Sequence, residues 1–298
     1  MRNRLITLVV LVLLVVTVVP ASLPPVAAQD KPAPDKQEKK APAKPEADKQ
    51  EKAKSEKPSA DKNPTAEQIA ETVIAVYGAR QGLAQIRRNG LERGRLTRTL
   101  GDGKTEEATY ERRFIRGEST AKDKVRLDQK APTAEYALIY GDGRVWGIVN
   151  GSYFTPREET SNVFLAQIWH DADALLRYKE NGSTLAYVGK EKQKSLDLWV
   201  LDVTDKEQRR TRYYISAKSG RILWLEYEEP ITAGGPPVKF KKTFHDYRYA
   251  QSTLVPFRTV LYQDDKQVLE TQVLTVTYSV KMDETLFQSE AAAAATSQ

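Results

Sequence analysis

The chain of 298 residues contains two histidines, the side chains best suited to acid–base catalysis near neutral pH. His170 is close to Asp171 and Asp173, a set of residue types that can bind a metal ion. At helical spacing i, i+1 and i+3 these side chains do not converge on one cation, so we interpret His170 as a helix-surface residue. His245 and Asp246 fall in a strand pattern, which directs them to opposite faces. We therefore expect no metal and no catalytic residue; a Ser-His-Asp triad assembled across the fold is the open alternative.

Three short motifs resemble functional sites but are better explained as turns. The sequence Gly-Asp-Gly-Lys-Thr at 101–105 ends like a phosphate-binding loop, but Arg98 stands where that motif requires glycine. Asn-Gly-Ser at 150–152 and 181–183 matches the glycosylation acceptor pattern, but Asn-Gly also predicts turns between strands, and we favour the turns. We expect no nucleotide and no other cofactor.

The net charge of +6 does not indicate nucleic-acid binding once it is divided along the chain. The first 28 residues contribute +2, residues 30–64 contribute +2, and +2 remains for the rest. We expect no nucleic acid as a partner.

The first 28 residues have the pattern of a cleavable secretory signal. Arg2 and Arg4 precede an aliphatic run over residues 5–19, and prolines end that run. Small residues at 26–28 suit a cut before Gln29, and an uncleaved signal anchor is the alternative. The chain has no cysteine, which excludes disulfides and an acylated N-terminal cysteine. We expect a soluble, exported protein.

Residues 29–64 are rich in Lys, Glu, Ala and Pro and contain almost no large apolar side chain. Such a segment cannot bury enough surface to offset its chain entropy, so we predict a disordered linker. A folded domain is predicted over residues 65–288, followed by a flexible tail over residues 289–298.

Two segments have helical periodicity. Thr65 and Gln68 fit a capping box, and apolar residues then recur every three or four positions to Ile86. A second stripe lies within residues 162–179; there we expect Gln167, Asp171, Asp173 and Arg177 to face away from the apolar side.

The other segments alternate as strands. Gly-Asp-Gly at 101–103 and 141–143 predicts hairpin turns. Leu196–Val203 and Ile222–Glu228 are apolar on both faces, so each strand must be covered on both faces. The four tryptophans either fill a core or line a cavity. This order predicts an α+β fold, with a large antiparallel sheet covered by helices on one side.

The order of elements and several motifs resemble the LolA-like superfamily of periplasmic lipoprotein-sorting proteins and their lipid-binding or stress-sensing relatives. The motifs are Tyr213–Gly220 running into Arg221–Glu226, Phe244–Arg248, Leu254–Arg258 and Asp283–Phe287. Ser252 and Thr253 stand where such proteins often have glycine.

The resemblance implies an incomplete β-barrel whose open side is covered by helices, with an apolar cavity for acyl chains. It implies a non-enzymatic, monomeric periplasmic carrier of lipid or lipoprotein acyl chains, with membrane sorting proteins as further partners. The alternative is a regulatory or structural module of the cell envelope that contacts another protein. The candidate lining residues mix both strand faces: Leu198, Trp199, Val200, Trp224, Leu225, Tyr227 and Phe257.

Overall fold

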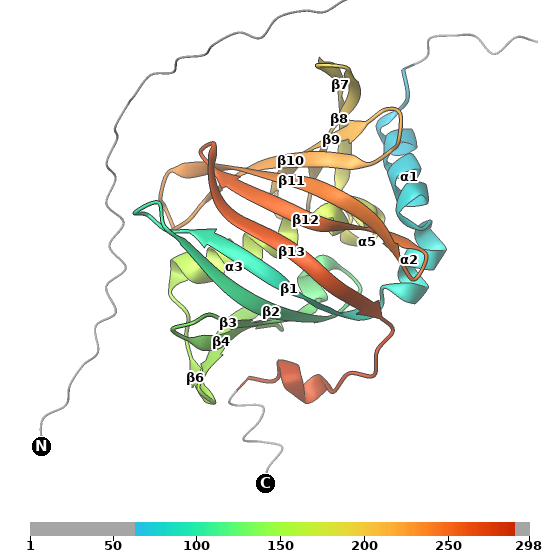
Figure 1. Cartoon of the computed structure of the whole chain (residues 1–298). Helices are drawn as coiled ribbons and strands as arrows, with labels where there is room; N and C mark the ends of the chain where they lie inside the picture. Colours follow the sequence, from blue (N-terminus) through green and yellow to red (C-terminus); the bar gives the residue numbers. More distant parts are fainter. Residues whose placement is uncertain (1–62, 290–298) are drawn as a thin grey trace, which may run out of the picture. The chain divides into compact units, whose positions relative to one another are not determined.

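The computed structural model describes residues 63–289 of the chain. Within this range, thirteen strands form one antiparallel sheet, and helices lie against one of its faces (Figure 1). The secretory signal predicted over residues 1–28 lies outside the described residues. So do all but the end of the linker predicted over 29–64 and all but the start of the tail predicted over 289–298.

The elements follow one another along the chain in this order: α1 (Ala66–Tyr77), α2 (Arg80–Ile86), β1 (Asn89–Thr99), β2 (Thr105–Ile115), the 3₁₀ turn η1 (Thr120–Lys122), β3 (Lys124–Lys130), β4 (Glu135–Gly141), β5 (Arg144–Val149), β6 (Ser152–Phe154), α3 (Glu158–Trp169), α4 (Ala172–Leu176), α5 (Tyr178–Asn181), β7 (Thr184–Gln193), β8 (Leu196–Thr204), β9 (Arg210–Ser216), β10 (Ile222–Pro230), β11 (Pro237–Ala250), β12 (Thr253–Gln263), β13 (Lys266–Tyr278) and the 3₁₀ turn η2 (Glu284–Phe287).

The start of α1 is the predicted capping box. The Gln68 N–H donates to Thr65 Oγ1 at 3.2 Å, and the Thr65 N–H donates to Gln68 Oε1 at 2.8 Å. These two bonds satisfy backbone groups that have no partner inside the helix. The expectation of one helix to Ile86 is wrong, because the chain turns at Gly78 with a φ of 134° before α2 begins. A Cβ on Gly78 would lie 3.3 Å from the Thr253 side chain, so glycine also permits close packing there.

Strands β6 and β7 follow one another in the sequence but lie at opposite edges of the sheet. β1 pairs with β13 in the centre, β2–β6 extend to one edge, and β12–β7 extend to the other. The connection from β6 to β7 must therefore cross the whole sheet, and it carries α3, α4 and α5 (Figure 1). This crossover covers the open side of the sheet.

Three of the four predicted glycine turns connect the strands of hairpins. Gly141–Gly143 connects β4 to β5, and Gly101–Gly103 connects β1 to β2. Asn150 and Gly151, with φ values of 49° and 79°, connect β5 to β6. The second Asn-Gly pair differs from the prediction: Asn181 ends α5, and Gly182 is its left-handed cap, so this turn joins a helix to a strand.

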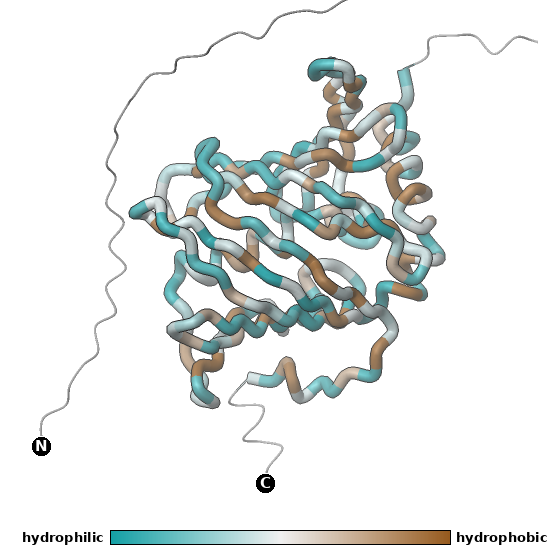
Figure 2. The backbone as a smooth tube through the Cα atoms, viewed as in Figure 1, coloured by the Kyte–Doolittle hydropathy of each residue, from teal (hydrophilic) through white to brown (hydrophobic). Residues whose placement is uncertain are grey.

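Side chains alternate between two faces along each strand, as the pleat requires. Hydrophobic and hydrophilic positions interchange along β11–β13 (Figure 2). We call the face that contacts the helices the inner face, and the opposite one the outer face. The predicted α+β fold class is confirmed. The sheet is antiparallel and open, and β6 and β7 form its two edges.

Candidate functional site

The first apolar cluster lies between β8–β12 and the helices α1, α4 and α5. Ile69 and Val73 of α1 and Leu175 of α4 are fully buried against the inner face. Leu225 and Tyr227 of β10 are among the strand residues that they contact. The apolar stripe of α1 faces the sheet because its members recur at helical spacing.

The second apolar cluster lies under α3, toward β2–β5. Phe164 and Ile168 of α3 are buried there together with Phe114 of β2 and with Val255 and Phe257 of β12. The two clusters occupy the same face of the sheet. The helical crossover therefore covers an almost continuous apolar surface.

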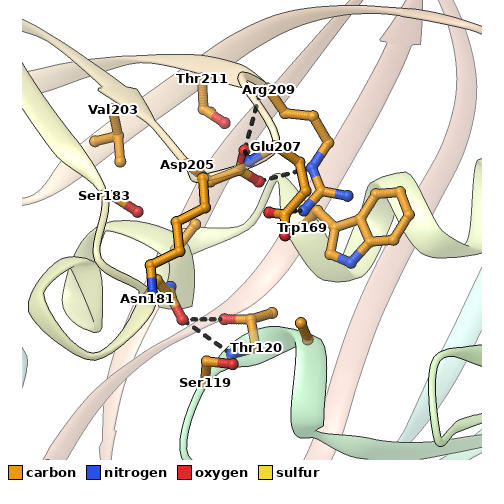
Figure 3. A pocket seen from close by; sticks show the side chains of 13 residues that line it. Ser119, Thr120, Trp169, Asn181, Ser183, Val203, Asp205, Glu207, Arg209 and Thr211 are labelled. Atoms are coloured by element: carbon orange, nitrogen blue, oxygen red, sulfur yellow. Dashed lines mark hydrogen bonds and ion pairs between the residues drawn. The ribbon is translucent and has the colours of Figure 1, made fainter.

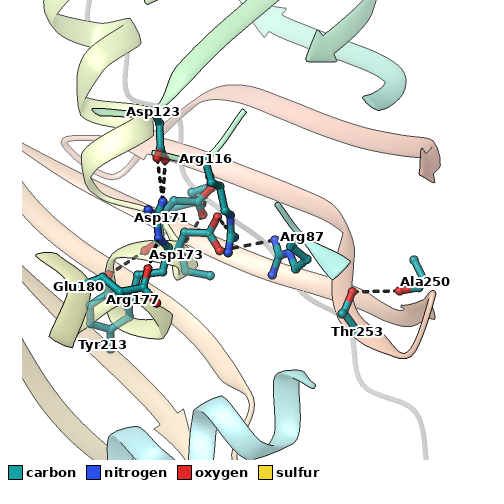
Figure 4. Close-up of polar contacts among 12 residues, drawn as sticks. Arg87, Arg116, Asp123, Asp171, Asp173, Arg177, Glu180, Tyr213, Ala250 and Thr253 are labelled. Atoms are coloured by element: carbon teal, nitrogen blue, oxygen red, sulfur yellow. Dashed lines mark hydrogen bonds and ion pairs between the residues drawn. The ribbon is translucent and has the colours of Figure 1, made fainter. Parts of the chain in front are cut away.

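Charged residues gather where α3 ends and α4 begins (Figure 4). We call this set the arginine–aspartate network; its members are Arg87, Arg116, Asp123, Asp171, Asp173, Arg177 and Lys242. They come from the helical crossover, from β11, from the ends of α2 and β2 and, for Asp123, from the end of η1. The network therefore fastens the crossover to both halves of the sheet.

Arg177, which follows α4, is the most fully paired member. Its Nη1 lies 2.7 and 2.9 Å from the two carboxylate oxygens of Asp123, and its Nε lies 2.8 Å from Glu180 Oε2. Its Nη2 donates to the carbonyl oxygen of Gly117 at 2.8 Å. Burial disfavours the charge, but Asp123 together with Glu180 and Asp173 more than compensates and raises the pKa of Arg177. Charge-assisted hydrogen bonds to several partners fix the orientation of this guanidinium.

Asp173 of α4 serves two guanidinium groups. Arg116 donates to its Oδ2, and Arg87 Nη2 lies 3.5 Å from its Oδ1. Burial opposes ionisation of Asp173, but Arg116 and Arg87 lower its pKa well below the ordinary range. The carboxylate is therefore charged, and it holds α4 against the ends of α2 and β2.

Asp171 joins the crossover to the other half of the sheet. Its Oδ1 accepts from the Ala172 N–H at 2.8 Å, which caps α4, and lies 3.1 Å from Lys242 Nζ on β11. Its carbonyl oxygen accepts from the Tyr213 hydroxyl at 2.7 Å. One residue thus starts a helix and anchors it to β9 and β11.

The expectation that the polar residues of the second helical segment face away from the apolar interior is wrong. Asp173 and Arg177 join the arginine–aspartate network, Asp171 contacts Lys242 of the inner face, and Gln167 lines a small cavity between α3 and the sheet. The single helix predicted over residues 162–179 is interrupted at His170 and Asp171 and again at Arg177. Each interruption rotates the following helix, so side chains on the polar side of one ideal helix turn toward the sheet.

His170 is also buried rather than on a helix surface, with 1% of its area exposed. Its Nδ1 lies 2.6 Å from Thr211 Oγ1, its Nε2 lies 3.2 Å from Glu229 Oε1, and its ring stacks on Tyr227 at 4.0 Å. His245 is on the outer face, with Nε2 2.8 Å from Thr243 Oγ1. Among residues 63–289, no three His, Asp or Glu side chains are grouped to hold a metal ion.

A cavity of about 70 Å³ opens beside Trp169, between η1, α5 and the β8–β9 turn (Figure 3). Arg209 lies over the Trp169 ring, 3.7 Å from its centroid, and forms an ion pair with Asp205 at 2.6 Å. Asn181 Oδ1 accepts from the Thr120 amide and hydroxyl at 2.9 and 3.0 Å. This cavity is small and its lining is mixed: Arg209 is paired with Asp205 and Glu207, whereas Trp169 and Val203 contribute apolar surface.

A second cavity, of about 30 Å³, lies on the inner face between α3 and β10–β13. His170, Tyr227, Lys242 and Leu261 are among its lining residues. A space of this size accommodates a water molecule rather than a lipid. An acyl chain would therefore have to displace helical side chains from the inner face.

The structure separates the seven candidate lining residues into two groups. Trp199, Leu225 and Tyr227 belong to the first apolar cluster, and Phe257 belongs to the second. The other three candidates are on the outer face: Leu198, Val200 and Trp224.

The outer-face group forms a small cluster of its own. Tyr214 and Trp224 on neighbouring strands stack at 4.4 Å and lie against the fully buried Leu198 and Val200. The second face of the doubly apolar strand is thus covered by aromatic side chains of the same sheet, and only the inner face is covered by helices. Lys241 lies 4.9 Å above the Trp224 ring.

The sequence matches no protein-family model and no curated protein. The fold does have solved counterparts. A domain of an outer membrane lipoprotein-sorting protein from Vibrio parahaemolyticus, described as putative, has a TM-score of 0.52 and 11% identity, covering 75% of this chain and 96% of its own. A LolA superfamily protein from Nitrosomonas europaea has a TM-score of 0.53 and 11% identity, covering 77% of this chain and 100% of its own. A DUF1329 family protein from Desulfovibrio piger has a TM-score of 0.54 and 9% identity, covering 77% of this chain and 100% of its own.

These likenesses establish a LolA-like fold, as the sequence motifs predicted. At identities of 9–11% they concern the fold alone. Within residues 63–289, none of the helices combines the length and the apolar character needed to cross a bilayer.

Proposed function

We propose that this protein binds lipids, among them the acyl chains of lipoproteins, on the inner face of its sheet and carries them without enzymatic chemistry. The observation that carries the proposal is the cover of that face. Two apolar clusters are closed by a crossover made of three short helices, together with α1, and the sheet itself stays open. A cover built of short, interrupted helices can be displaced with the sheet intact.

The energetics favour exchange of one apolar partner for another. Burying an aliphatic chain contributes about 0.8 kcal/mol per methylene, so a long acyl chain supplies on the order of 10 kcal/mol. Exposing the Leu175 and Leu176 side chains of α4 costs about 1.5–3 kcal/mol each by the same measure. An acyl chain that replaces these side chains can therefore offset the cost of moving the helix.

The two histidines support a non-enzymatic protein. His170 is only 1% exposed, and its ring is stacked on Tyr227 and hydrogen-bonded to Thr211 and Glu229, so it is buried from substrate and holds α3 to the sheet. His245 is on the opposite face of the sheet. We assign the protein to the periplasm, as an exported carrier whose further partners are membrane sorting proteins, on the basis of the predicted signal and the fold.

The tryptophans on the two faces provide a direct test. Trp199 borders the first apolar cluster on the inner face, whereas Trp224 is stacked on Tyr214 on the outer face. Two variants would each keep one of these tryptophans and replace the other three by phenylalanine. A lipid with a brominated acyl chain quenches a tryptophan only by close contact, so we expect strong quenching of Trp199 and little of Trp224.

Equal quenching of both tryptophans, or no quenching at saturating lipid, would contradict binding on the inner face. Native mass spectrometry of protein purified from the cell envelope supplies a second readout, namely lipid that copurifies. Repeated absence of such lipid together with absence of quenching would overturn the proposal.

The edge strand β7 favours a second candidate function, contact with another protein. Val188 on β7 and Leu196 at the start of β8 are exposed by 47% and 45%, although both are large and apolar. An edge strand of this kind can accept a further strand from a partner. Replacing Val188 by lysine would abolish such a contact and leave lipid binding unchanged, which a pull-down from envelope extract with lipid analysis would measure.

A further inference from the structure

The pair Arg87 and Arg116 shares a single carboxylate. Arg177 is neutralised by Asp123 and Glu180, and Lys242 is neutralised by Asp171, so Asp173 is the counter-ion left for both guanidinium groups. The Nε atoms of Arg87 and Arg116 are buried and have no hydrogen-bond partner within the described residues, and Asp173 Oδ1 does not satisfy either of them, since it also has none. Buried donors without partners are unfavourable, so this pair can bind more anion than Asp173 supplies.

Asp173 is the most exposed member of this trio. Its side chain is 26% exposed, compared with 14% for Arg87 and 9% for Arg116. Arg87 is also positioned by Tyr278, since its guanidinium carbon lies 5.4 Å from the centroid of that ring. The carboxylate therefore lies over this pair of guanidinium groups and is carried on a short helix of five residues.

The helix that carries Asp173 is apolar on its other side. Leu175 and Leu176 are buried in the first apolar cluster, within three residues of the carboxylate. Helix α4 thus presents one negative charge to two arginines and an aliphatic surface to the sheet. A molecule with an anionic head and an aliphatic tail has the same two features.

We propose that α4 occupies the site of an anionic amphiphile, whose carboxylate or phosphate head would bind Arg87 and Arg116 in place of Asp173 while its tail replaces Leu175 and Leu176. This inference rests on the proposed lipid binding and adds the chemical class of the ligand. Arginine suits the role because its fork of N–H donors matches carboxylate and phosphate oxygens.

The test compares palmitate with methyl palmitate, which has the same tail and no charge. Each ligand would displace Nile red, an uncharged apolar dye, from the full-length protein. We expect wild type to bind palmitate at least about tenfold more tightly than the ester, since charge-assisted bonds to two arginines act on the acid alone. Arg87→Gln with Arg116→Gln should abolish this preference.

The variant Asp173→Asn removes the internal competitor. It should raise palmitate affinity about tenfold more than ester affinity, because release of α4 favours both ligands, whereas only an anion can replace the lost counter-ion of two arginines. Arg258→Gln is the control, since Arg258 pairs with Glu270 on the outer face and should leave the preference unchanged. Thermal unfolding shows which variants fold; if the double variant does not, Asp173→Asn decides.

The outcomes separate the two proposals. If wild type binds neither ligand, the proposed lipid binding fails. If it binds both equally, and Asp173→Asn does not change that, lipid binding stands and the anionic headgroup is overturned. If inorganic phosphate alone binds Asp173→Asn as tightly as palmitate in calorimetry, the site takes a free anion, and the amphiphile is overturned.

Discussion

The hydroxyl groups of Tyr77 and Tyr247 lie 2.8 Å apart and join α1 to β11. The Ile222 N–H donates to the Tyr77 hydroxyl at 3.4 Å, and the Tyr247 hydroxyl donates to the Ile222 carbonyl oxygen. The Tyr77 hydroxyl must then donate to Tyr247, which closes a ring of three hydrogen bonds. Burial raises the pKa of Tyr77, so the ring stays protonated throughout the neutral range. Such rings strengthen each member bond.

Replacing Tyr77 by phenylalanine should lower the free energy of unfolding by about 1–2 kcal/mol, because the Ile222 N–H loses this acceptor and the Tyr247 hydroxyl loses its donor. Urea denaturation measures this loss. Tyr249→Phe is the matched control, since Tyr249 is an exposed tyrosine and should change the stability by less than about 0.5 kcal/mol. Equal effects of the two variants would show that the hydrogen-bond ring does not anchor α1.

His170 provides a prediction that separates stacking from hydrogen bonding. His170→Ala removes the ring stacked on Tyr227 and both hydrogen bonds, so we expect a loss of about 3 kcal/mol. His170→Phe keeps a stacked ring but leaves the buried Thr211 hydroxyl without its partner, so the loss should be about 1–2 kcal/mol.

Chemical denaturation of both variants, with His245→Ala as control, measures these differences. His245 is exposed on the outer face, and its removal should cost less than about 0.5 kcal/mol. A phenylalanine variant that is no more stable than the alanine variant would contradict a contribution from stacking.

Features that depend on neighbouring residues could be predicted from the sequence. The capping box at Thr65 and Gln68 and the turn at Asn150 and Gly151 are examples. Each results from chemistry within four residues, which the sequence displays directly. The motifs around Phe244–Arg248 and Leu254–Arg258 led to the fold class by resemblance.

The arginine–aspartate network could not be predicted in this way. Arg116 and Asp173 are 57 positions apart, and they meet only because the crossover from β6 to β7 passes over the end of β2. Nothing around Arg87 or Arg116 distinguishes them from the many other arginines of this chain. The strand faces of Trp199 and Trp224 were also ambiguous, since apolar residues on both faces leave the inner one undetermined.

Two glycines have opposite structural roles, and alanine substitutions should show this. Gly82 lies in α2, and a Cβ there would meet no atom within 4 Å. Gly82→Ala should therefore stabilise the protein by about 0.5–1 kcal/mol, because alanine loses less chain entropy in a helix. A Cβ on Gly90 of β1 would lie 2.7 Å from the Phe114 ring and 2.9 Å from the Tyr278 ring.

Gly90→Ala should thus destabilise the protein by about 1–3 kcal/mol, because two buried aromatic rings must move. Thermal unfolding of the two variants side by side measures both effects. A stabilised Gly90→Ala protein would show that the inner face near β1 can yield to an added methyl group.

The pH dependence of stability should report the bond between Asp173 and its two arginines. Because Arg116 and Arg87 lower the pKa of Asp173 in the folded protein, its contribution is fully present above its ordinary pKa of 3.8. It is lost progressively as the pH falls below that value. At pH 7, Asp173→Asn should lower the free energy of unfolding by about 3 kcal/mol, since it leaves a buried charge unpaired.

The difference between wild type and Asp173→Asn should then shrink as the pH falls from about 4 to 2, since the unfolded chain takes up the proton first. Urea denaturation at several pH values measures this difference. Glu270→Gln, which breaks the half-exposed pair with Arg258, should cost less than about 1 kcal/mol at pH 7. A wild-type advantage that stays constant down to pH 2 would mean that Asp173 stabilises the crossover by its shape rather than by its charge.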